Sequence, residues 1–366
     1  MMRASLYRTS LRYGGGLMLH TASSGPVDGL DTLHLRLQDK EITAVGEVRI
    51  NIAYLNGMAA ETVECEAVGL LECVDWTKDA ERLLTDLAMT DGVSAPVRML
   101  VDIALHDFLA RRDRIPLAAW LGADCIRSVS YPTNQTLFIS SAGRFLSQAE
   151  SYVSRGFRDL KVRVGSAGFD DDVARLVALR ERFGGDIKLA IDANGAWSAD
   201  EAVENLSALA GFELAYVEQP VAAGDWDVLN RLAETSPIPL MLDESVAGQA
   251  DVDTVIRSKG RLWAHLKLVK LGGIAPTRAA ADRLRAAGIP FMIGQMNEGG
   301  IATAAALHLA CAVGPHFAEL YGADGLENDP ASGLIYAQGR VGSSAAPGLG
   351  LTFEASKTRL IREFSA

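Results

Sequence analysis

The sequence predicts an α/β protein, namely a (β/α)8-type TIM barrel with an α+β capping domain formed by the N-terminal region and the C-terminal segment. Three observations lead to this fold class. The first part of the chain reads as strands followed by helices, which is an α+β pattern. Further along, short apolar runs alternate with helical patterns, and successive runs begin at residues 160, 189, 215, 240, 264, 290 and 316. This spacing suits one strand, one crossover helix and two short loops. Beyond residue 320 the chain is irregular and rich in glycine and proline, so we expect it to pack back against the cap.

The capping domain is expected to cover residues 1–122. Its strands are expected at residues 4–13, 30–37 and 41–49. The second of these alternates apolar and polar side chains, as a half-buried antiparallel strand does. Helices follow over 61–115, and residues 96–112 carry apolar side chains at helical spacing. The segment 14–26 is rich in glycine and serine, which suits either a lid over a binding site or an ordinary surface loop.

The barrel is expected to cover residues 123–325, followed by a returning segment at 326–366. Its eight strands are expected at residues 129–134, 160–164, 189–192, 215–218, 240–243, 264–268, 290–293 and 316–320. Helices are expected at residues 170–183, 198–210, 225–234, 276–287 and 301–312. A doubly wound sheet is the alternative, but no Gly-x-Gly-x-x-Gly fingerprint follows a first strand.

Composition argues against several classes of function. The 366-residue chain has a net charge of −11 and no run of Lys or Arg, so nucleic acid is not an expected partner. The longest apolar run, residues 301–313, is too short to span a bilayer and contains His308, so we expect no membrane partner. The four cysteines have neither metal-ligand spacing nor a disulfide pattern, and the N-terminus lacks a secretory segment. These features favour a cytoplasmic location.

Three of the predicted barrel strands end on a carboxylate. Asp192, Glu218 and Asp243 follow short apolar runs at even spacings of 26 and 25 residues. The ends of successive barrel strands meet at one mouth, where three unpaired carboxylates would repel each other. A divalent cation removes that repulsion, and all-oxygen ligation suits Mg²⁺ or Mn²⁺. Any one of these acids taken alone suits a helix N-cap equally well.

Basic residues lie on the strands before and after the acidic ones. Lys161 and Arg163 are two residues apart on one strand, so both point to the same face. On the strand after Asp243, Lys267 shares a face with His265. A lysine buried near a metal and other cations has a lowered pKa and can act as a general base near neutral pH. The residues therefore suit binding of a substrate carboxylate and removal of a proton from the adjacent carbon.

The order of these side chains resembles the enolase superfamily, which uses a Lys or His base beside Mg²⁺. More narrowly, the chain is similar to the muconate-lactonising-enzyme subgroup of the mandelate racemase/muconate lactonising group. The matching pieces are Ala-Ile-Asp-Ala-Asn at 190–194, Val-Glu-Gln-Pro at 217–220, Leu-Asp-Glu-Ser at 242–245 and Leu-Lys-Leu-Val-Lys-Leu-Gly-Gly at 266–273. The helix around 101–107 and Leu121-Gly122 resemble the join between cap and barrel.

The resemblance implies a role for each matched residue. Asp192, Glu218 and Asp243 would ligate Mg²⁺, with Mn²⁺ as a substitute, and Lys267 would be the base. Lys161 and Arg163 would complete the catalytic group, and Asn194 and Glu244 would support the ligands. Polar residues at the strand ends would contact a small carboxylate substrate, namely Asn134, Gln135, Gln295, Glu298 and Glu319. Cap loops at 14–26 and 51–57 would close over it, and relatives of this kind are commonly homo-oligomers.

Two departures from the family pattern bear on the reaction. The family usually has Lys-x-Lys on the second strand, and here the second position is Arg163, which stays protonated and is a poor base. We therefore expect a one-base dehydratase or cycloisomerase, with a racemase or epimerase of an amino-acid or hydroxy-acid derivative as the alternative. An inactive ligand-binding barrel is a further alternative. Dipeptide epimerases carry Asp-x-Asp at the eighth strand, where this chain has Glu319-Leu-Tyr321, which argues against a dipeptide substrate.

Overall fold

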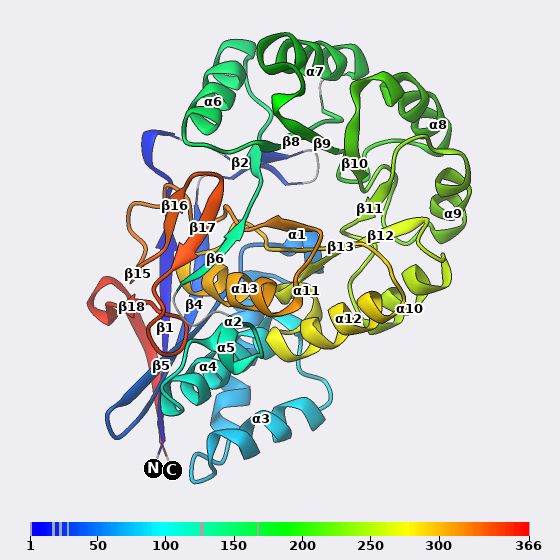
Figure 1. Ribbon diagram of the computed structural model, residues 1–366. Coiled ribbons are helices and arrows are strands. Elements are labelled where there is room, and N and C mark those ends of the chain that lie inside the picture. The colour runs from blue at the N-terminus through cyan, green and yellow to red at the C-terminus, as the bar shows by residue number, and fades with distance from the viewer. Residues whose placement is uncertain are drawn as a thin grey trace.

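The computed structural model describes residues 2–16, 19–21, 24–27, 29–124, 128–166 and 168–365. A ring of strands and helices forms the barrel, and a second sheet with its own helices lies beside it as the cap (Figure 1). The N- and C-termini lie next to each other at the end of the cap sheet (Figure 1). Among the described residues, no helix is both long and apolar enough to cross a membrane.

The cap sheet has the strand order β19-β1-β4-β5. Its strands are β1 Arg3–Leu11, β4 Leu30–Asp39, β5 Ile42–Arg49 and β19 Arg359–Ser365. The short strands β2 Leu19–Thr21 and β3 Gly25–Val27 form a separate hairpin. The helices of this part are α1 Ala53–Asn56, α2 Ala60–Cys73, α3 Ala80–Met89, α4 Ala95–Arg112 and α5 Leu117–Trp120. Because β19 pairs antiparallel with β1, the C-terminal segment does return to the cap as predicted.

The barrel sheet is parallel and has the order β14-β13-β12-β11-β10-β9-β8-β7. Its strands are β7 Gln135–Leu137, β8 Asp159–Arg163, β9 Lys188–Asp192, β10 Leu214–Glu218, β11 Leu240–Leu242, β12 Leu262–Lys267, β13 Phe291–Gly294 and β14 Phe317–Glu319. The helices between them are α6 Ala142–Ser154, α7 Phe169–Phe183, α8 Ala199–Ala208, α9 Trp226–Thr235, α10 Gln249–Arg257, the single turn α11 Leu268–Leu271, α12 Ile274–Ala286 and α13 Gly300–Val313.

The remaining elements are short. They are β6 Val129–Pro132, β15 Ala331–Ser332, β16 Ile335–Ala337, β17 Arg340–Ser343 and β18 Thr352–Phe353. Single 3-10 turns lie at Gly14–Gly16, Gly184–Asp186, Leu209–Phe212 and Ala355–Lys357. In the described part of the chain, β14 is followed by these strands rather than by another crossover helix, so the barrel has eight strands but its last βα unit is incomplete.

One predicted barrel strand is wrong in its placement. Residues 129–134 were expected to form the first barrel strand, but β6 pairs antiparallel with β17 in a separate sheet. The first barrel strand is β7, which starts at Gln135. The apolar pattern of a short strand does not say which neighbour it will pair with, so the sequence could not separate these two assignments. The ends of the barrel sheet still approach each other, since the Asn134 amide donates to the Ala318 carbonyl over 3.1 Å.

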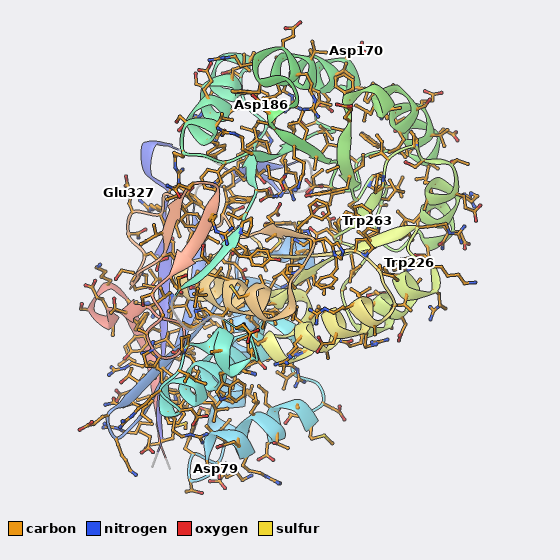
Figure 2. The ribbon with its side chains drawn as sticks, in the orientation of Figure 1. Asp79, Asp170, Asp186, Trp226, Trp263 and Glu327 are labelled. Atoms are coloured by element: carbon orange, nitrogen blue, oxygen red, sulfur yellow. The ribbon has the colours of Figure 1, made fainter. Side chains whose placement is uncertain are left out.

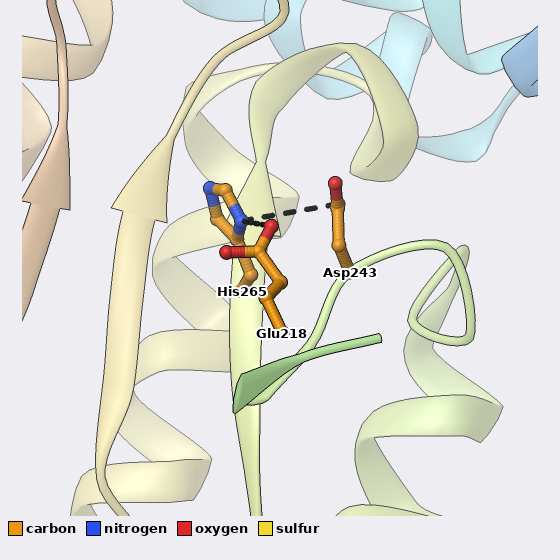
Figure 3. A group of neighbouring side chains, drawn as sticks. All are labelled: Glu218, Asp243 and His265. Carbon is orange, nitrogen blue, oxygen red and sulfur yellow. Dashed lines mark hydrogen bonds and ion pairs between the residues drawn. The ribbon is translucent and has the colours of Figure 1, made fainter. Parts of the chain in front are cut away.

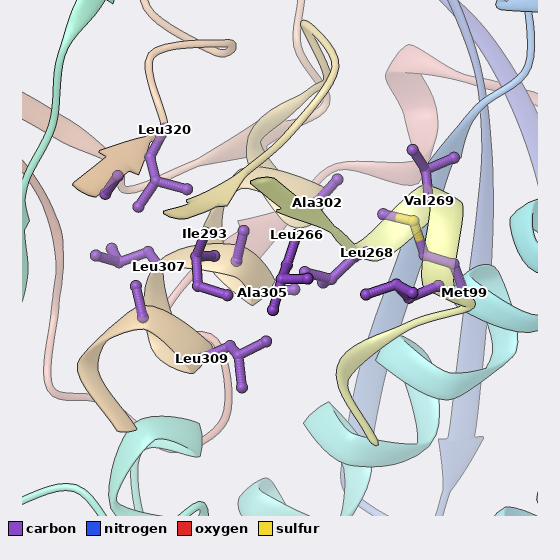
Figure 4. Packing of buried hydrophobic residues seen from close by; sticks show 14 of the residues in the cluster. Met99, Leu266, Leu268, Val269, Ile293, Ala302, Ala305, Leu307, Leu309 and Leu320 are labelled. Atoms are coloured by element: carbon purple, nitrogen blue, oxygen red, sulfur yellow. The ribbon is translucent and has the colours of Figure 1, made fainter. Parts of the chain in front are cut away.

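The outer face of the barrel packs tightly on α13. Leu266, Ile293 and Leu320 lie over Ala302 and other small or aliphatic side chains of that helix (Figure 4). The alanines of α13 let the helix approach the strands closely, which explains why the helix is apolar on nearly every side. The same strands alternate, so their other side chains point into the barrel.

The interior of the barrel is closed at the end opposite the acidic strand ends. Trp263 stacks on Phe317 with 5.9 Å between ring centroids, and Tyr216 meets Phe317 edge-on at 5.0 Å. Figure 2 labels Trp263 among the side chains that fill this region. Ala190, Met241 and Met292 pack in one cluster with these rings. The barrel is therefore a packed core with chemistry at one mouth.

The junction between cap and barrel is built from buried polar side chains. Asp107 of α4 accepts hydrogen bonds from the amides of Val45 at 3.0 Å and Leu349 at 2.8 Å. Glu47 of β5 accepts from the amides of Gly299 at 2.6 Å, Ile301 at 3.0 Å and Ala302 at 3.2 Å. Glu47 therefore caps the N-terminus of α13 from the cap domain.

His308 joins three segments at the same junction. The Ala118 amide donates to its Nδ1 over 2.8 Å, and its Nε2 contacts the Leu349 carbonyl at 3.1 Å. These partners require the neutral tautomer with the proton on Nε2. Burial lowers the pKa of His308 to about 4, which agrees with a neutral ring.

Candidate active site

The pairing of neighbouring strands shows where the predicted site residues lie along the barrel axis. Arg163, Asp192 and Glu218 are direct partners across β8, β9 and β10. On the other side of the barrel, Lys267 and Glu319 are both level with Gly294. Asp243 follows the last residue of β11. The sequence placed these side chains at strand ends, and the register brings them to one mouth, where every one of them is buried.

Two of the three predicted metal ligands lie together, and a histidine joins them. Oxygens of Glu218 and Asp243 and a ring nitrogen of His265 lie within 4.8 Å of one another, and Figure 3 shows the three side chains converging. Asp192 is outside this group, because its carboxylate is paired with the guanidinium of Arg163 and lies 3.3 Å from the Lys161 amine. The expected set of three carboxylates is therefore present at the mouth, but Asp192 is turned toward Arg163 and away from the other two.

Burial makes the carboxylates at the mouth costly to charge. It raises the pKa of Asp192, an effect that the Arg163 charge opposes. Burial likewise raises the pKa of Glu218, and the charge of Lys161 opposes it. Such groups gain from a nearby cation, and two carboxylates with a third beside them are the oxygen donors that Mg²⁺ or Mn²⁺ prefers. The residues present therefore fit a divalent cation.

His265 is held as a neutral ring behind the carboxylates. Its Nδ1 lies 3.0 Å from the Glu218 carboxylate, and its Nε2 has no hydrogen-bond partner in the described part of the chain. Burial is the largest cause that pushes the pKa of His265 well below its ordinary value. A Cβ on Gly294 would come within 1.9 Å of Nε2, so only glycine leaves room for this ring. His265 was noted in the sequence only for sharing a face with Lys267.

The predicted base is buried against a carboxylate. The Lys267 amine donates to Asp243 over 2.6 Å, and Lys270 binds the other oxygen of the same carboxylate at 2.6 Å. Burial lowers the pKa of Lys267, but the charges of Asp243, Glu319 and Glu218 outweigh that effect, so the pKa lies above its ordinary value. Carboxylates outnumber the cations among the protein groups beside this amine, and the predicted lowering, which counts the charge of a bound metal, stays a prediction.

Lys161 and Arg163 occupy different environments although they share a face. Lys161 lies 3.1 Å from Glu218 and is also paired with Glu319, and it has no exposed surface. Burial opposes its charge, but these carboxylates raise its pKa well above the ordinary value. Arg163 borders the cavity described below and is paired with Asp192. Both side chains are thus cationic at neutral pH.

The residues expected to support the ligands form a short chain of hydrogen bonds. The Asn194 amide nitrogen of the backbone donates to Asp192 over 2.9 Å, and its side chain donates to Glu244 over 3.0 Å. Asn194 has φ of +46°, a left-handed conformation that asparagine tolerates better than most residues. Burial, followed by the charge of Asp243, raises the pKa of Glu244 to about 7.

A cavity of about 270 Å³ lies above this group, between barrel and cap. The predicted residues that line it are Arg163, Asn194, Asp243, Glu244, Lys267 and Gln295. Lys161, Asp192 and Glu218 do not line it, so they form the layer beneath. The cavity is of a size that suits a small molecule, and charged and amide side chains make up much of its lining.

The predicted substrate contacts divide into two kinds. Gln295 borders the cavity, and its side-chain nitrogen donates to Thr303 over 2.9 Å. Asn134 instead donates to Glu319 over 3.1 Å, and neither of these two lines the cavity. Glu298 is buried beside it, and burial raises its pKa to about 8. Gln135 was also predicted to contact substrate, but its side chain donates to Asp324 within the protein over 2.9 Å.

The cap supplies the other wall of the cavity. Its lining side chains are Leu19, Ser24, Val27, Arg49, Tyr54 and Leu55. Both predicted lid segments therefore reach the cavity, and parts of the first, at 17–18 and 22–23, lie outside the described residues, as does Cys125. Sequence reasoning missed Arg49, Phe138, Gln219, Met296 and Asn297. Arg49 was detectable only as a charged residue between the apolar Val48 and Ile50, directly before a predicted lid.

Comparison with known proteins gives the class and then the family. A parallel barrel whose mouth gathers carboxylates and lysines under a capping domain defines a class of barrel enzyme fold. The family model "Enolase C-terminal domain-like" matches residues 144–357, more than half of the chain. This protein belongs to that family and, with its relatives, to the mandelate racemase/muconate lactonising group of the enolase superfamily.

Individual relatives agree with this assignment. The chain is 32% identical over 234 residues to the L-Ala-D/L-Glu epimerase of Bacillus subtilis, and the match spans 63% of each chain. The dipeptide epimerase from Enterococcus faecalis V583, complexed with Mg and L-Leu-L-Tyr, has a TM-score of 0.86 at 27% identity, covering 96% of this chain and 99% of that one. The muconate lactonizing enzyme from Pseudomonas fluorescens shares the fold, with a TM-score of 0.88 at 23% identity over 97% and 96% of the chains.

Proposed function

We propose that this protein is a Mg²⁺-dependent enzyme that removes the α-proton of a small carboxylic acid, with Lys267 as the base. One observation carries the proposal: Lys267 and Arg163 line the same cavity, and each is bound to a different carboxylate of the acidic set. A lysine that becomes a proton acceptor in its neutral form and a fixed arginine cation thus border a space that a small acid would fill.

Asp192, Glu218 and Asp243 would hold the metal, with His265 hydrogen-bonded to Glu218 from behind. The cation supplies positive charge for the substrate carboxylate and for the negative charge that develops when the α-proton leaves. Mn²⁺ suits the same oxygen donors. Lys267 accepts the proton in its neutral form, and Asp243, at 2.6 Å from the amine, controls how readily that form is reached.

The relatives favour isomerisation at the α-carbon of an amino-acid derivative as the overall reaction, since several of them are epimerases. The pattern at the eighth strand favours a derivative without a free ammonium group. Tyr321 stands where dipeptide epimerases carry the second Asp, and burial raises the pKa of its hydroxyl, so no anion is offered there. We therefore propose an N-acylated amino acid as the substrate type.

Arg163 favours a second candidate function, in which only one face of the α-carbon meets a base. Arginine cannot accept a proton under these conditions, and its pKa is raised further by Asp192 against the effect of burial. Lys161 is shielded from the cavity by its carboxylates. A dehydration or cycloisomerisation needs one base and would suit this asymmetry.

Exchange of the substrate α-proton with solvent deuterium tests the proposal. N-acylated amino acids, hydroxy acids and acid sugars would be incubated with the enzyme and Mg²⁺ in D₂O. We expect exchange that Lys267→Ala reduces at least about 10³-fold, because the base is lost. Arg163→Ala is expected to weaken binding while exchange stays detectable. The exposed Lys357→Ala serves as the matched control and should behave as the parent.

The stereochemistry of the label separates the two candidate reactions. Deuterium in both enantiomers at similar rates supports a racemase or epimerase, whereas deuterium in one enantiomer supports the one-base reaction. Absence of exchange across all three substrate classes would overturn the proposal and leave a ligand-binding barrel.

A further inference from the structure

Arg49 is a buried cation at the wall of the cavity. It is the last residue of β5, only 1% exposed, and it lines the cavity from the cap side. The other cations that line the cavity, Arg163 and Lys267, are each paired with a carboxylate. In the part of the chain that the structure describes, no carboxylate oxygen lies within 4.0 Å of the Arg49 guanidinium. A buried charge without a counter-ion is costly to the folded state.

The partners of Arg49 are neutral oxygens. Its Nε donates to the Asn51 side chain over 2.8 Å, Nη1 to the Asn297 carbonyl over 3.2 Å, and Nη2 to the Asn51 carbonyl over 3.4 Å. These contacts use one hydrogen on each nitrogen, so each terminal nitrogen keeps one more hydrogen to donate. A pair of N–H groups on one guanidinium is the arrangement that binds a carboxylate in a bidentate way.

Glu298, whose pKa responds to the charge of Arg49, does not neutralise that charge. Glu298 feels the Arg49 charge, but burial outweighs it and raises the pKa of Glu298 to about 8. The carboxyl is therefore largely protonated at pH 7 and supplies no counter-charge for Arg49. Asn51 and Asn297 fix the guanidinium between cap and barrel, so the cation is held in position before any ligand arrives.

We propose that Arg49 binds a second carboxylate of the substrate, distinct from the one that faces Asp192, Glu218 and Asp243. This inference rests on the proposed function, and it narrows the substrate to dicarboxylic acids. An N-acyl amino acid meets this requirement when either its acyl group or its side chain ends in a carboxylate. Arg49 then acts as a specificity-determining residue and takes no part in proton transfer.

Ligand binding tests this inference without requiring turnover. Calorimetric titrations with Mg²⁺ present would use the Lys267→Met variant, which lacks the base, and two matched ligand pairs. One pair is N-succinyl-L-alanine and its neutral analogue N-butanoyl-L-alanine. The other pair is N-acetyl-L-glutamate and N-acetyl-L-glutamine. We expect the charged member of at least one pair to bind at least tenfold more tightly.

Adding Arg49→Met should reduce that preference to less than twofold, with the affinity of the neutral member unchanged. Arg49→Lys should keep part of the preference, because lysine keeps the positive charge but lacks the pair of N–H groups that binds a carboxylate in a bidentate way. Asn51→Ala is the control for a merely structural role, since it removes the side-chain acceptor but keeps the guanidinium and its contacts with the Asn51 and Asn297 carbonyls. The preference should survive in that variant.

Two outcomes would overturn the inference. One is equal affinity, or no binding, for the charged and neutral members of both pairs. The other is an Arg49→Met variant that weakens both members alike, which would indicate a structural role. Neither outcome depends on α-proton exchange, so the failure of this inference and that of the proposed reaction are distinguishable.

Discussion

The protein buries polar side chains in two regions, and they are satisfied in different ways. At the junction of cap and barrel, Glu47, Asp107 and His308 meet backbone amides and carbonyls of distant segments. At the barrel mouth, charged side chains meet other charged side chains, as in the contacts of Lys161 and Lys267. Backbone groups cannot turn away, whereas lysine and arginine side chains can.

The two regions also differ in how many buried polar side-chain atoms lack a hydrogen-bond partner. In the described chain, buried side-chain atoms without a hydrogen-bond partner at or beside the mouth are His265 Nε2, Arg163 Nε, Glu244 Oε2, Asn134 Oδ1, Gln295 Oε1 and Glu298 Oε1. Among the described residues no side-chain atom of Glu47, Asp107 or His308 is in that state, although both ring nitrogens of His34, 3.8 Å from Glu47, are. The three side chains that hold the junction together therefore use their polar atoms for structure, while the mouth keeps bonding capacity for a ligand.

The largest change in stability is expected from a substitution at the junction of cap and barrel. Asp107→Ala leaves the Val45 and Leu349 amides buried without an acceptor and also removes a partner of Arg111. We expect a loss of about 3 kcal/mol in the free energy of unfolding, measured by urea denaturation. Activity per folded molecule should be unchanged. The neighbouring Asp113→Ala, at a more exposed position, should change stability by less than about 0.5 kcal/mol.

The next prediction concerns the barrel mouth, where a substitution should change ligand binding and leave stability nearly unchanged. Glu218→Gln should weaken Mg²⁺ binding at least about 100-fold in a calorimetric titration, because one ligand charge is lost. Stability should change little, since burial already disfavours the Glu218 charge and Lys161 keeps its contacts with Glu319 and Asp192. The exposed Glu204→Gln is the control. Parent-like Mg²⁺ binding by Glu218→Gln would contradict the assignment of this ligand.

The smallest effect is a pH dependence at the junction. The folded-state pKa of His308 is lowered to about 4 from an ordinary value of 6.5. The unfolded chain therefore takes up the proton first, so stability is fully present above about pH 6.5 and is lost as pH falls toward 4. Between pH 7.5 and pH 5 this histidine should account for about 2 kcal/mol.

His308→Gln provides the comparison for that measurement. Glutamine can accept from the Ala118 amide and donate to the Leu349 carbonyl, but it does not titrate. Urea denaturation at both pH values should show the parent losing about 2 kcal/mol more than the variant. An equal loss in the two proteins would show that other groups control the acid sensitivity.

Much of the architecture was predictable because it is encoded along the chain. The spacing of apolar runs predicted the barrel, and the position of each acid or lysine at the end of its run predicted the mouth. The helix before the barrel was correctly expected at the join, because Asp102 of that helix accepts a hydrogen bond from the Ile274 amide of α12 over 2.5 Å. The oligomeric state and the cytoplasmic location remain predictions, as does the closing of the segment 14–26 over a substrate.

The sequence by itself determined which side chains share a strand face and which strand end they occupy, because alternation and element length are local properties. It placed Asp192, Glu218, Asp243 and Lys267 at one mouth. Only the tertiary structure decided how those groups pair. Contacts across strands turned Asp192 toward Arg163 and set His265 against Glu218. The pKa of Lys267 and the entry of Arg49 into the cavity also depend on distances between separate elements, since charge effects act through space rather than along the chain.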